Sequence, residues 1–163
     1  MRILAIDPGF DRIGVAVLEK KNGREVVLHS SCIMTDRSTT FPIRLLSIEK
    51  SLEYVIREHH PTACAIEKLF LTTNQTTVMR VAEARGVIVV TAARHNLPVY
   101  DLTPLEIKMA VTGYGKADKS QVNMMVRKTV IIEKENMLDD EMDAIAIGVT
   151  ALAIFGKTTY PQK

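Results

Sequence analysis

Four carboxylates occupy positions where a polar side chain needs a reason. Asp7 and Glu67 each end a short apolar run that is typical of a buried strand, while Asp140 and Asp143 open a third apolar run with helical spacing. Strand ends meet at the rim of a sheet, and residues three apart share one helix face. Hard anionic oxygen ligands of this kind suit Mg²⁺, and such sites most often serve phosphoryl transfer. The spacing therefore predicts a divalent metal site.

Each acid also has a simpler explanation. Asp7-Pro8-Gly9 is a good turn sequence, and Glu67 could be the first solvated residue after a strand. The acids at 139–143 could complement the positive end of a helix dipole. Turns and helix dipoles do not explain why all of these acids occur together. No basic residue adjoins Asp7, Asp140 or Asp143 in the sequence to neutralise them.

The periodicity predicts an α/β fold in which a mixed five-stranded sheet is flanked by helices. Asn22-Gly23 is a strong hairpin signal, and Pro42 fits the first turn of a helix that ends before Pro61. Strands are expected at 2–6, 12–18, 26–34, 62–67 and 97–101, and further helices at 75–96, 104–112, 118–132 and 140–155. The first three strands form an antiparallel meander.

Length and composition favour one compact domain. With 163 residues and 47% hydrophobic residues, we expect a single domain over 1–156 and a loose tail over 157–163. The net charge of +2 neither demands nor excludes nucleic acid. Cys32 and Cys64 are interpreted as reduced packing residues, and no signal peptide or membrane span is indicated. A cytoplasmic protein without membrane contact is expected.

Five motifs in order carry a family resemblance over nearly the whole chain. They are ILAIDPGFDRIGVAVLE, AIEKLF, EARGV, GYGKADKSQVNMMV and DDEMDAIAIG. Together they resemble the bacterial RuvC Holliday junction resolvases, which are crossover junction endodeoxyribonucleases. The resemblance implies a ribonuclease H-like fold and a homodimer that cuts four-way DNA junctions symmetrically in recombination and repair. It also implies the branch-migration proteins RuvA and RuvB as partners.

The resemblance assigns catalysis and metal binding to Asp7, Glu67, Asp140 and Asp143. Two Mg²⁺ ions are expected, with Mn²⁺ as a substitute, one activating water and one stabilising the leaving 3′ oxygen. The extra acid Asp139 leaves open which of Asp139 and Asp140 is the ligand. We choose Asp140 because its three-residue spacing to Asp143 matches the family and the helix.

DNA contacts follow from the same resemblance. Lys108 and Lys119 match lysines that contact DNA, although an isolated lysine is more often only solvated. Phe70 aligns with an aromatic that stacks on an unpaired base, where stacking contributes roughly 1–3 kcal/mol, although a lone Phe is more often core. Asn74 follows in a polar loop, and Lys116 belongs to a basic segment before the last acids.

The helix expected over 75–96 is apolar on more than one side, which fits either burial between layers or a dimer interface. The family's dimer favours the interface, because two twofold-related strands are cut most simply by two twofold-related sites. A charge on this helix, as in Ala84→Glu, is therefore expected to yield monomers.

Two other classes compete with a nuclease. Asp7-x-Gly9 followed by Gly14 resembles the first phosphate loop of actin-like ATPases and sugar kinases, but those enzymes need two such lobes. A non-catalytic DNA-binding module would not need four acids, since carboxylates repel phosphate unless a cation intervenes.

Overall fold

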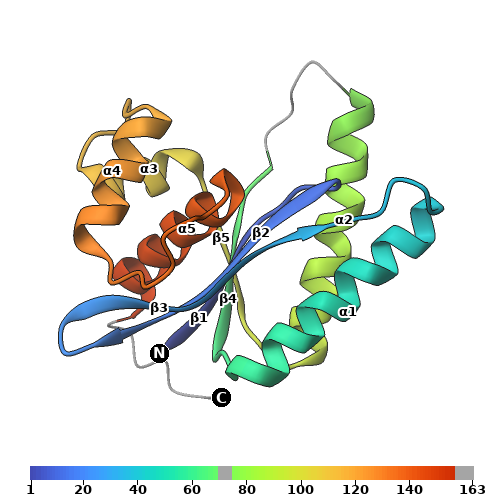
Figure 1. Cartoon of the computed structure of the whole chain (residues 1–163), viewed down its shortest axis with the longest axis horizontal. Helices are drawn as coiled ribbons and strands as arrows, with labels where there is room; N and C mark the ends of the chain where they lie inside the picture. Colours follow the sequence, from blue (N-terminus) through green and yellow to red (C-terminus); the bar gives the residue numbers. More distant parts are fainter. Residues whose placement is uncertain (70–74, 157–163) are drawn as a thin grey trace.

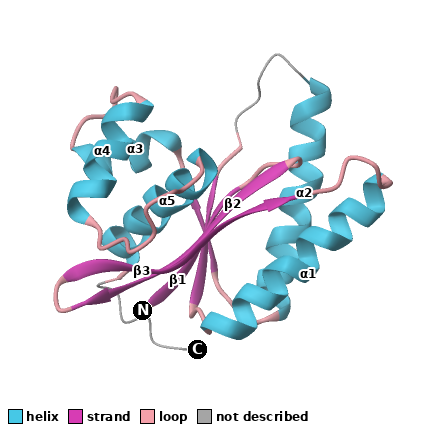
Figure 2. Cartoon of the chain, in the orientation of Figure 1, coloured by secondary structure: helices cyan, strands magenta, loops and turns pink. Residues whose placement is uncertain are grey.

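The computed structural model describes residues 1–69 and 75–156, and within this part the chain forms one five-stranded sheet with helices on both faces (Figures 1 and 2). The elements are β1 (Arg2–Asp7), β2 (Arg12–Lys21), β3 (Arg24–Met34), α1 (Phe41–His59), β4 (Ala63–Glu67), α2 (Gln75–Arg94), β5 (Val99–Leu102), α3 (Pro104–Thr112), α4 (Lys119–Thr129) and α5 (Asp139–Phe155). The strand order is β3-β2-β1-β4-β5.

Strand direction decides which ends of the strands meet. β1, β2 and β3 pair antiparallel, and Asn22 and Gly23 join β2 to β3 with φ of 51° and 81°, the left-handed values that a tight hairpin turn needs. β4 lies parallel to both β1 and β5. The carboxyl ends of β1 and β4 therefore lie at the same edge of the sheet, and their last residues are Asp7 and Glu67.

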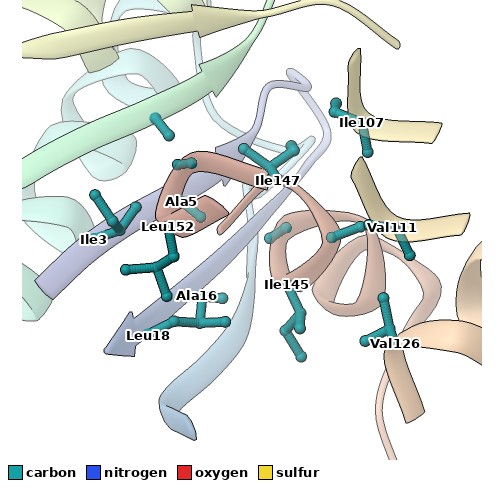
Figure 3. Packing of buried hydrophobic residues seen from close by; sticks show 14 of the residues in the cluster. Ile3, Ala5, Ala16, Leu18, Ile107, Val111, Val126, Ile145, Ile147 and Leu152 are labelled. Atoms are coloured by element: carbon teal, nitrogen blue, oxygen red, sulfur yellow. The ribbon is translucent and has the colours of Figure 1, made fainter. Parts of the chain in front are cut away.

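Alternating side chains of β1 build two cores, because successive residues of a strand point to opposite faces. Ile3 and Ala5 pack with α3, α4 and α5, whereas Leu4 and Ile6 pack with α1 and α2. Figure 3 shows the first core, where Ala16 and Leu18 of β2 join Ile3 and Ala5. Both faces of the sheet are thus covered, which fixes the frame that carries the strand ends.

Two glycines let α5 lie directly on the sheet. A Cβ added to Gly148 would collide with the side chain of Leu18, and one added to Gly14 would collide with the carbonyl oxygen of Asp140. Any side chain at these positions would push the helix away from β2. The first turn of α5 is therefore fixed against the β1–β2 pair.

The predicted α/β class, five-stranded mixed sheet and flanking helices are confirmed. The largest difference at a helix end is in α4, which ends at Thr129 rather than near 132. The chain extends there because Ile131 forms a parallel bridge with Val26 and covers part of the β3 edge. The tail expected at 157–163 lies outside the described residues. No helix in the described ranges is long and apolar enough to span a membrane.

One expectation about α2 is wrong. Ala84 is fully buried and packs in the core with Ile88 and Ala92, so Ala84→Glu would place a charge in the core and would not report on a surface. The opposite side of α2 is exposed and consists largely of small and apolar residues: Met79, Ala82, Gly86, Val90 and Ala93. The predicted second apolar stripe exists, but on this side.

Candidate active site

Asp7 and Glu67 are neighbours at the rim of the sheet. The preceding residues, Ile6 and Ile66, are register partners in the parallel pair β1 and β4, and the Asp7 and Glu67 side chains share a hydrogen bond. Burial, followed by the charges of Glu67, Asp143 and Asp140, raises the pKa of Asp7 from 3.8 to about 7. Burial and the charge of Asp143 also raise the pKa of Glu67. Asp7 therefore interacts electrostatically with the three other predicted acids.

Gly14 brings the helix acids to this rim. Gly14 is the register partner of Asp7 in β2, and the backbone of Asp140 lies against it. Asp143 follows three residues later, on the same face of α5. Because Gly14 has no side chain, the acids at the start of α5 can approach Asp7. The side chain of Asp140 is 22% exposed and that of Asp139 is 76% exposed, which supports the choice of Asp140 as the ligand.

Two cations reach the acids from elements distant in sequence. Arg12, the first residue of β2, forms an ion pair with Asp140. Lys119, the first residue of α4, lies 2.8 Å from the Asp143 carboxylate and 3.6 Å from that of Asp139. Although no basic residue adjoins Asp7, Asp140 or Asp143 in the sequence, the fold brings a cation to Asp140 and another to Asp143. Sequence analysis missed Arg12, although its place five residues after Asp7, across a tight turn, was a usable signal.

A cleft of about 250 Å³ adjoins the acids. Glu67, Asp143, Lys108 and Lys119 line it, so two of the predicted DNA-binding lysines face the same space as two of the predicted ligands. Its remaining lining is mostly apolar: Pro104, Ile107, Val122, Ala146 and Ile147. Positive and negative side chains thus border a cavity beside the sheet rim.

The other predicted DNA contacts are not brought to this cleft. Lys116 is exposed in the turn between α3 and α4 and is not among the residues that line the cleft. Phe70 and Asn74 lie outside the described residues. Their roles stay predictions.

The acids fit a hard divalent cation in chemistry, although their side chains are not gathered into a ligand set. Within residues 1–69 and 75–156, no three His, Cys, Asp or Glu side chains are close enough together to hold one ion. Asp140 forms an ion pair with Arg12, and Asp143 forms one with Lys119. Asp7 and Glu67 share a hydrogen bond. Four carboxylates at one rim supply hard oxygen donors, the kind of ligand that Mg²⁺ prefers. These acids would hold the metal once the two cations release them.

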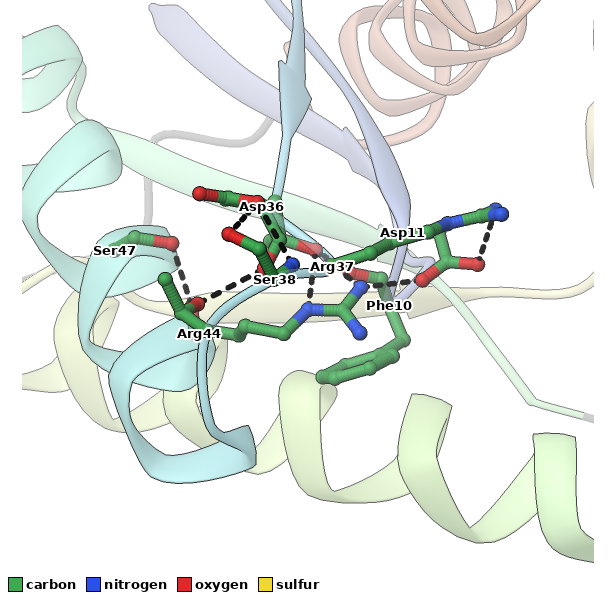
Figure 4. Close-up of polar contacts among 9 residues, drawn as sticks. Phe10, Asp11, Asp36, Arg37, Ser38, Arg44 and Ser47 are labelled. Atoms are coloured by element: carbon green, nitrogen blue, oxygen red, sulfur yellow. Dashed lines mark hydrogen bonds and ion pairs between the residues drawn. The ribbon is translucent and has the colours of Figure 1, made fainter.

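The turn between Asp7 and Arg12 is held by a buried arginine from α1 (Figure 4). Arg44 is 7% exposed and its guanidinium lies 3.8 Å from the centre of the Phe10 ring. Its Nε donates a 2.9 Å hydrogen bond to Thr35 Oγ1, and it forms an ion pair with Asp11. Thr35 in turn donates to the carbonyl oxygen of Phe10. This network fixes the turn and therefore the directions in which Asp7 and Arg12 leave it.

Glu141, an acid that does not face the cleft, holds the start of α5. Its buried carboxylate accepts hydrogen bonds of 2.7 Å from Ser30 and from Lys134, and one of 3.2 Å from the backbone N–H of Leu138. Burial acts to raise the pKa of Glu141, but these hydrogen bonds outweigh it and the pKa is lowered. Glu141 thus ties the first turn of α5 to β3 and is not a candidate ligand.

A ribonuclease H-like sheet with acids at the ends of β1 and β4 and at the start of α5 defines a class, the metal-dependent nucleases of this fold. The profile of the crossover junction endodeoxyribonuclease RuvC family matches residues 3–151. The chain belongs to this family and is a nuclease. A nuclease of this family implies a divalent metal cofactor.

Relatives and solved structures agree with this assignment. The RuvC proteins of Desulfitobacterium hafniense and Petrotoga mobilis are each 42% identical to this chain, over 91% and 90% of it and 90% of each relative. The structure of Thermus thermophilus RuvC in complex with a Holliday junction matches with a TM-score of 0.89 at 28% identity, covering 96% of this chain and 95% of that one. The yeast mitochondrial resolvase Ydc2 matches with a TM-score of 0.69 at 14% identity, over 91% of this chain and 76% of its own, which shows the shared fold alone.

Proposed function

We propose that this chain resolves four-way DNA junctions by paired, symmetric hydrolysis of two phosphodiester bonds. The observation that carries the proposal is the convergence of Asp7, Glu67, Asp140 and Asp143 at one sheet rim beside a lysine-lined cleft. A DNA-binding module would gain nothing from four acids, because carboxylates repel phosphate. A cation that joins acids and phosphate turns the same cluster into a catalytic site. Family membership supports the junction as substrate.

The four acids are proposed as ligands of two Mg²⁺ ions, with Mn²⁺ as a substitute. When bound, such ions activate a water and stabilise the leaving 3′ oxygen. Lys108 and Lys119 border the cleft and are proposed to neutralise and orient the DNA phosphates. The hydrogen bond between Asp7 and Glu67 at the rim supports the proposal that these two acids bind one ion together. Phe70, Asn74 and Lys116 are proposed as further DNA contacts.

A homodimer through the exposed side of α2 is proposed to bring two sites to one junction. Met79 and Val90 are 66% and 50% exposed, and Gly86 lies between them on the same side of the helix. Small residues let two helices approach closely, and burying the large ones removes apolar surface from water. Twofold symmetry of the protein then matches that of the junction.

The cellular setting is proposed from the family as well. Cys32 and Cys64 are free thiols, as is usual for proteins of a reducing compartment, so we place the enzyme in the cytoplasm, where RuvA and RuvB would supply branch-migrated junctions. We propose residues 1–156 as one nuclease domain and 157–163 as a tail.

Titration of Mg²⁺ against a labelled synthetic four-way junction tests the function. Two symmetric cuts that require the metal are expected, with little cutting of a linear duplex of the same sequence. Asp7→Asn serves as the inactive control, because it removes a carboxylate without changing the lysines. Junction binding without cutting at any Mg²⁺ or Mn²⁺ concentration would leave only a binding module. ATP hydrolysis without cutting would indicate the kinase-like alternative.

A further inference from the structure

Arg12 occupies an unusual position beside the carboxylate cluster. It opens β2 directly after the turn from Asp7, and its side chain, 47% exposed, forms an ion pair with Asp140. It also contacts the thiol of Cys32 on β3. The guanidinium therefore lies at the outer border of the site, between a carboxylate and solvent. Lys119 holds Asp143 on the other border, beside the cleft.

A divalent cation and the guanidinium of Arg12 compete for one carboxylate. Asp140 cannot give the same oxygens to both partners, and two positive groups a few ångströms apart repel each other. An exposed arginine has long reach, and once a cation takes Asp140 the guanidinium of Arg12 keeps the weaker contact with the neutral thiol of Cys32. Among the described cations near the four acids, Lys108 and Lys119 line the cleft. Arg12 belongs to β2, which contributes no residue to the lining.

We propose that Arg12 is a metal-released phosphate clamp: it holds Asp140 in the metal-free protein and, when a divalent cation takes Asp140, turns to a DNA phosphate. This inference rests on the proposed function, because it assumes that Asp140 is a metal ligand. Arginine suits the role because its planar fork binds carboxylate and phosphate alike. The exchange couples metal binding to DNA binding. It also spares the protein a carboxylate without a partner before the metal arrives.

Arg12→Gln tests the proposal with two readouts other than cleavage. The first is the affinity for Mn²⁺ without DNA, measured by calorimetry on the metal-free protein. It is expected to rise about twofold to fivefold, the ratio that corresponds to the loss of one competing exposed ion pair. Arg12→Lys, which keeps the charge, is expected to stay nearer to wild type. Arg57→Gln is the matched control, because Arg57 is an exposed arginine paired with Glu53 on α1.

The second readout is the slope of log K against log[salt] for binding of a four-way junction. In Ca²⁺ the slope of Arg12→Gln is expected to be smaller in magnitude than that of wild type by about 0.9, the value of one phosphate contact. In EDTA the two slopes are expected to agree, since Arg12 is then held by Asp140. Denaturing gels run in parallel confirm that the junction is uncut during the measurement.

Each outcome decides between the parts of the scheme. An unchanged Mn²⁺ affinity overturns the competition, and equal slopes in Ca²⁺ overturn the phosphate contact. A lowered slope in both Ca²⁺ and EDTA means that Arg12 contacts DNA at all times, which overturns the release. Cleavage of the junction by wild type in Mg²⁺ is measured separately, and its failure would refute the proposed function. If wild type cuts the junction but one of the three contradicting results is found, only the inference about Arg12 is refuted.

Discussion

Asp7→Asn is expected to stabilise the metal-free protein at high pH while it abolishes cleavage. Asp7 is the acid whose pKa rises most clearly, from 3.8 to about 7, and burial is the main cause, followed by Glu67, Asp143 and Asp140. Its folded pKa lies above the unfolded one, so between these values the folded protein keeps a proton that the unfolded chain has lost. The stability from this group is present at low pH and is lost as pH rises through 7.

The shift sets the expected size. A change of about 3 pKa units corresponds to about 4 kcal/mol of the free energy of unfolding above pH 8, and about 2 kcal/mol of this is already lost at pH 5. Asn carries no charge at either pH. The stability gained by Asp7→Asn over wild type should therefore be larger at pH 8 than at pH 5 by about 2–3 kcal/mol. The difference between the two pH values tests the pKa shift more directly than the stability gain at one pH, because pH-independent effects of the substitution cancel.

Urea unfolding of both proteins in EDTA at pH 5 and pH 8 measures this difference. Adding Mg²⁺ at pH 8 is expected to stabilise wild type more than Asp7→Asn, because the variant lacks one of the carboxylates that are proposed to bind the ion. Junction binding by the variant should be kept or tightened while cleavage is lost. A stability difference that is equal at the two pH values would refute the crowded acidic cluster, and substantial cleavage by the pure variant would refute the assignment of Asp7.

Four further outcomes are expected. Lys119→Ala should weaken junction binding and reduce the salt slope by about 0.9, and an unchanged slope would leave Lys119 only as the partner of Asp143. Val90→Glu should yield monomers in sedimentation and turn linear products of a cruciform plasmid into nicked circles; a dimeric variant would contradict this interface. Gly14→Ala should lower cleavage roughly a hundredfold by moving Asp140 about 1 Å, and normal activity would show that α5 can shift without harm. Glu141→Ala should cost about 1–3 kcal/mol in chemical unfolding, because Ser30 and Lys134 lose a buried acceptor.

Local patterns predicted the elements well because each pattern is enforced by burial. The continuous apolar run of β1 and the apolar spacing of α1 and α5 match their burial in the structure, since both faces of the sheet are covered. The turn at Asn22-Gly23 could be read directly, because few residues adopt the left-handed conformation that both positions need. The end of α4 could not be predicted in this way, because the chain becomes extended where Ile131 pairs with Val26 of β3, 105 positions earlier in the sequence.

Partners of the acids were beyond sequence reasoning for the same reason. The pairing of Arg12 with Asp140 spans 128 positions, and the close contact of α5 with Gly14 helps to bring the two residues together. Arg44 of α1 is buried because Phe10, Asp11 and Thr35 contact its guanidinium, and nothing in the local sequence signals these contacts. Residue type and spacing identified the acids as a set, whereas tertiary contacts decide which cation each acid meets.

The arrangement of charge explains why a DNA enzyme can have a net charge of only +2. In the metal-free protein, Arg12 and Lys119 are each turned toward a carboxylate, so positive and negative groups cancel at the rim where the substrate must bind. In the proposed scheme, a divalent cation that binds the acids would add positive charge and free these side chains at the same time. In this scheme, the local potential toward a phosphate therefore changes by more than the charge of the ion alone, and this change orients the DNA phosphate at the site.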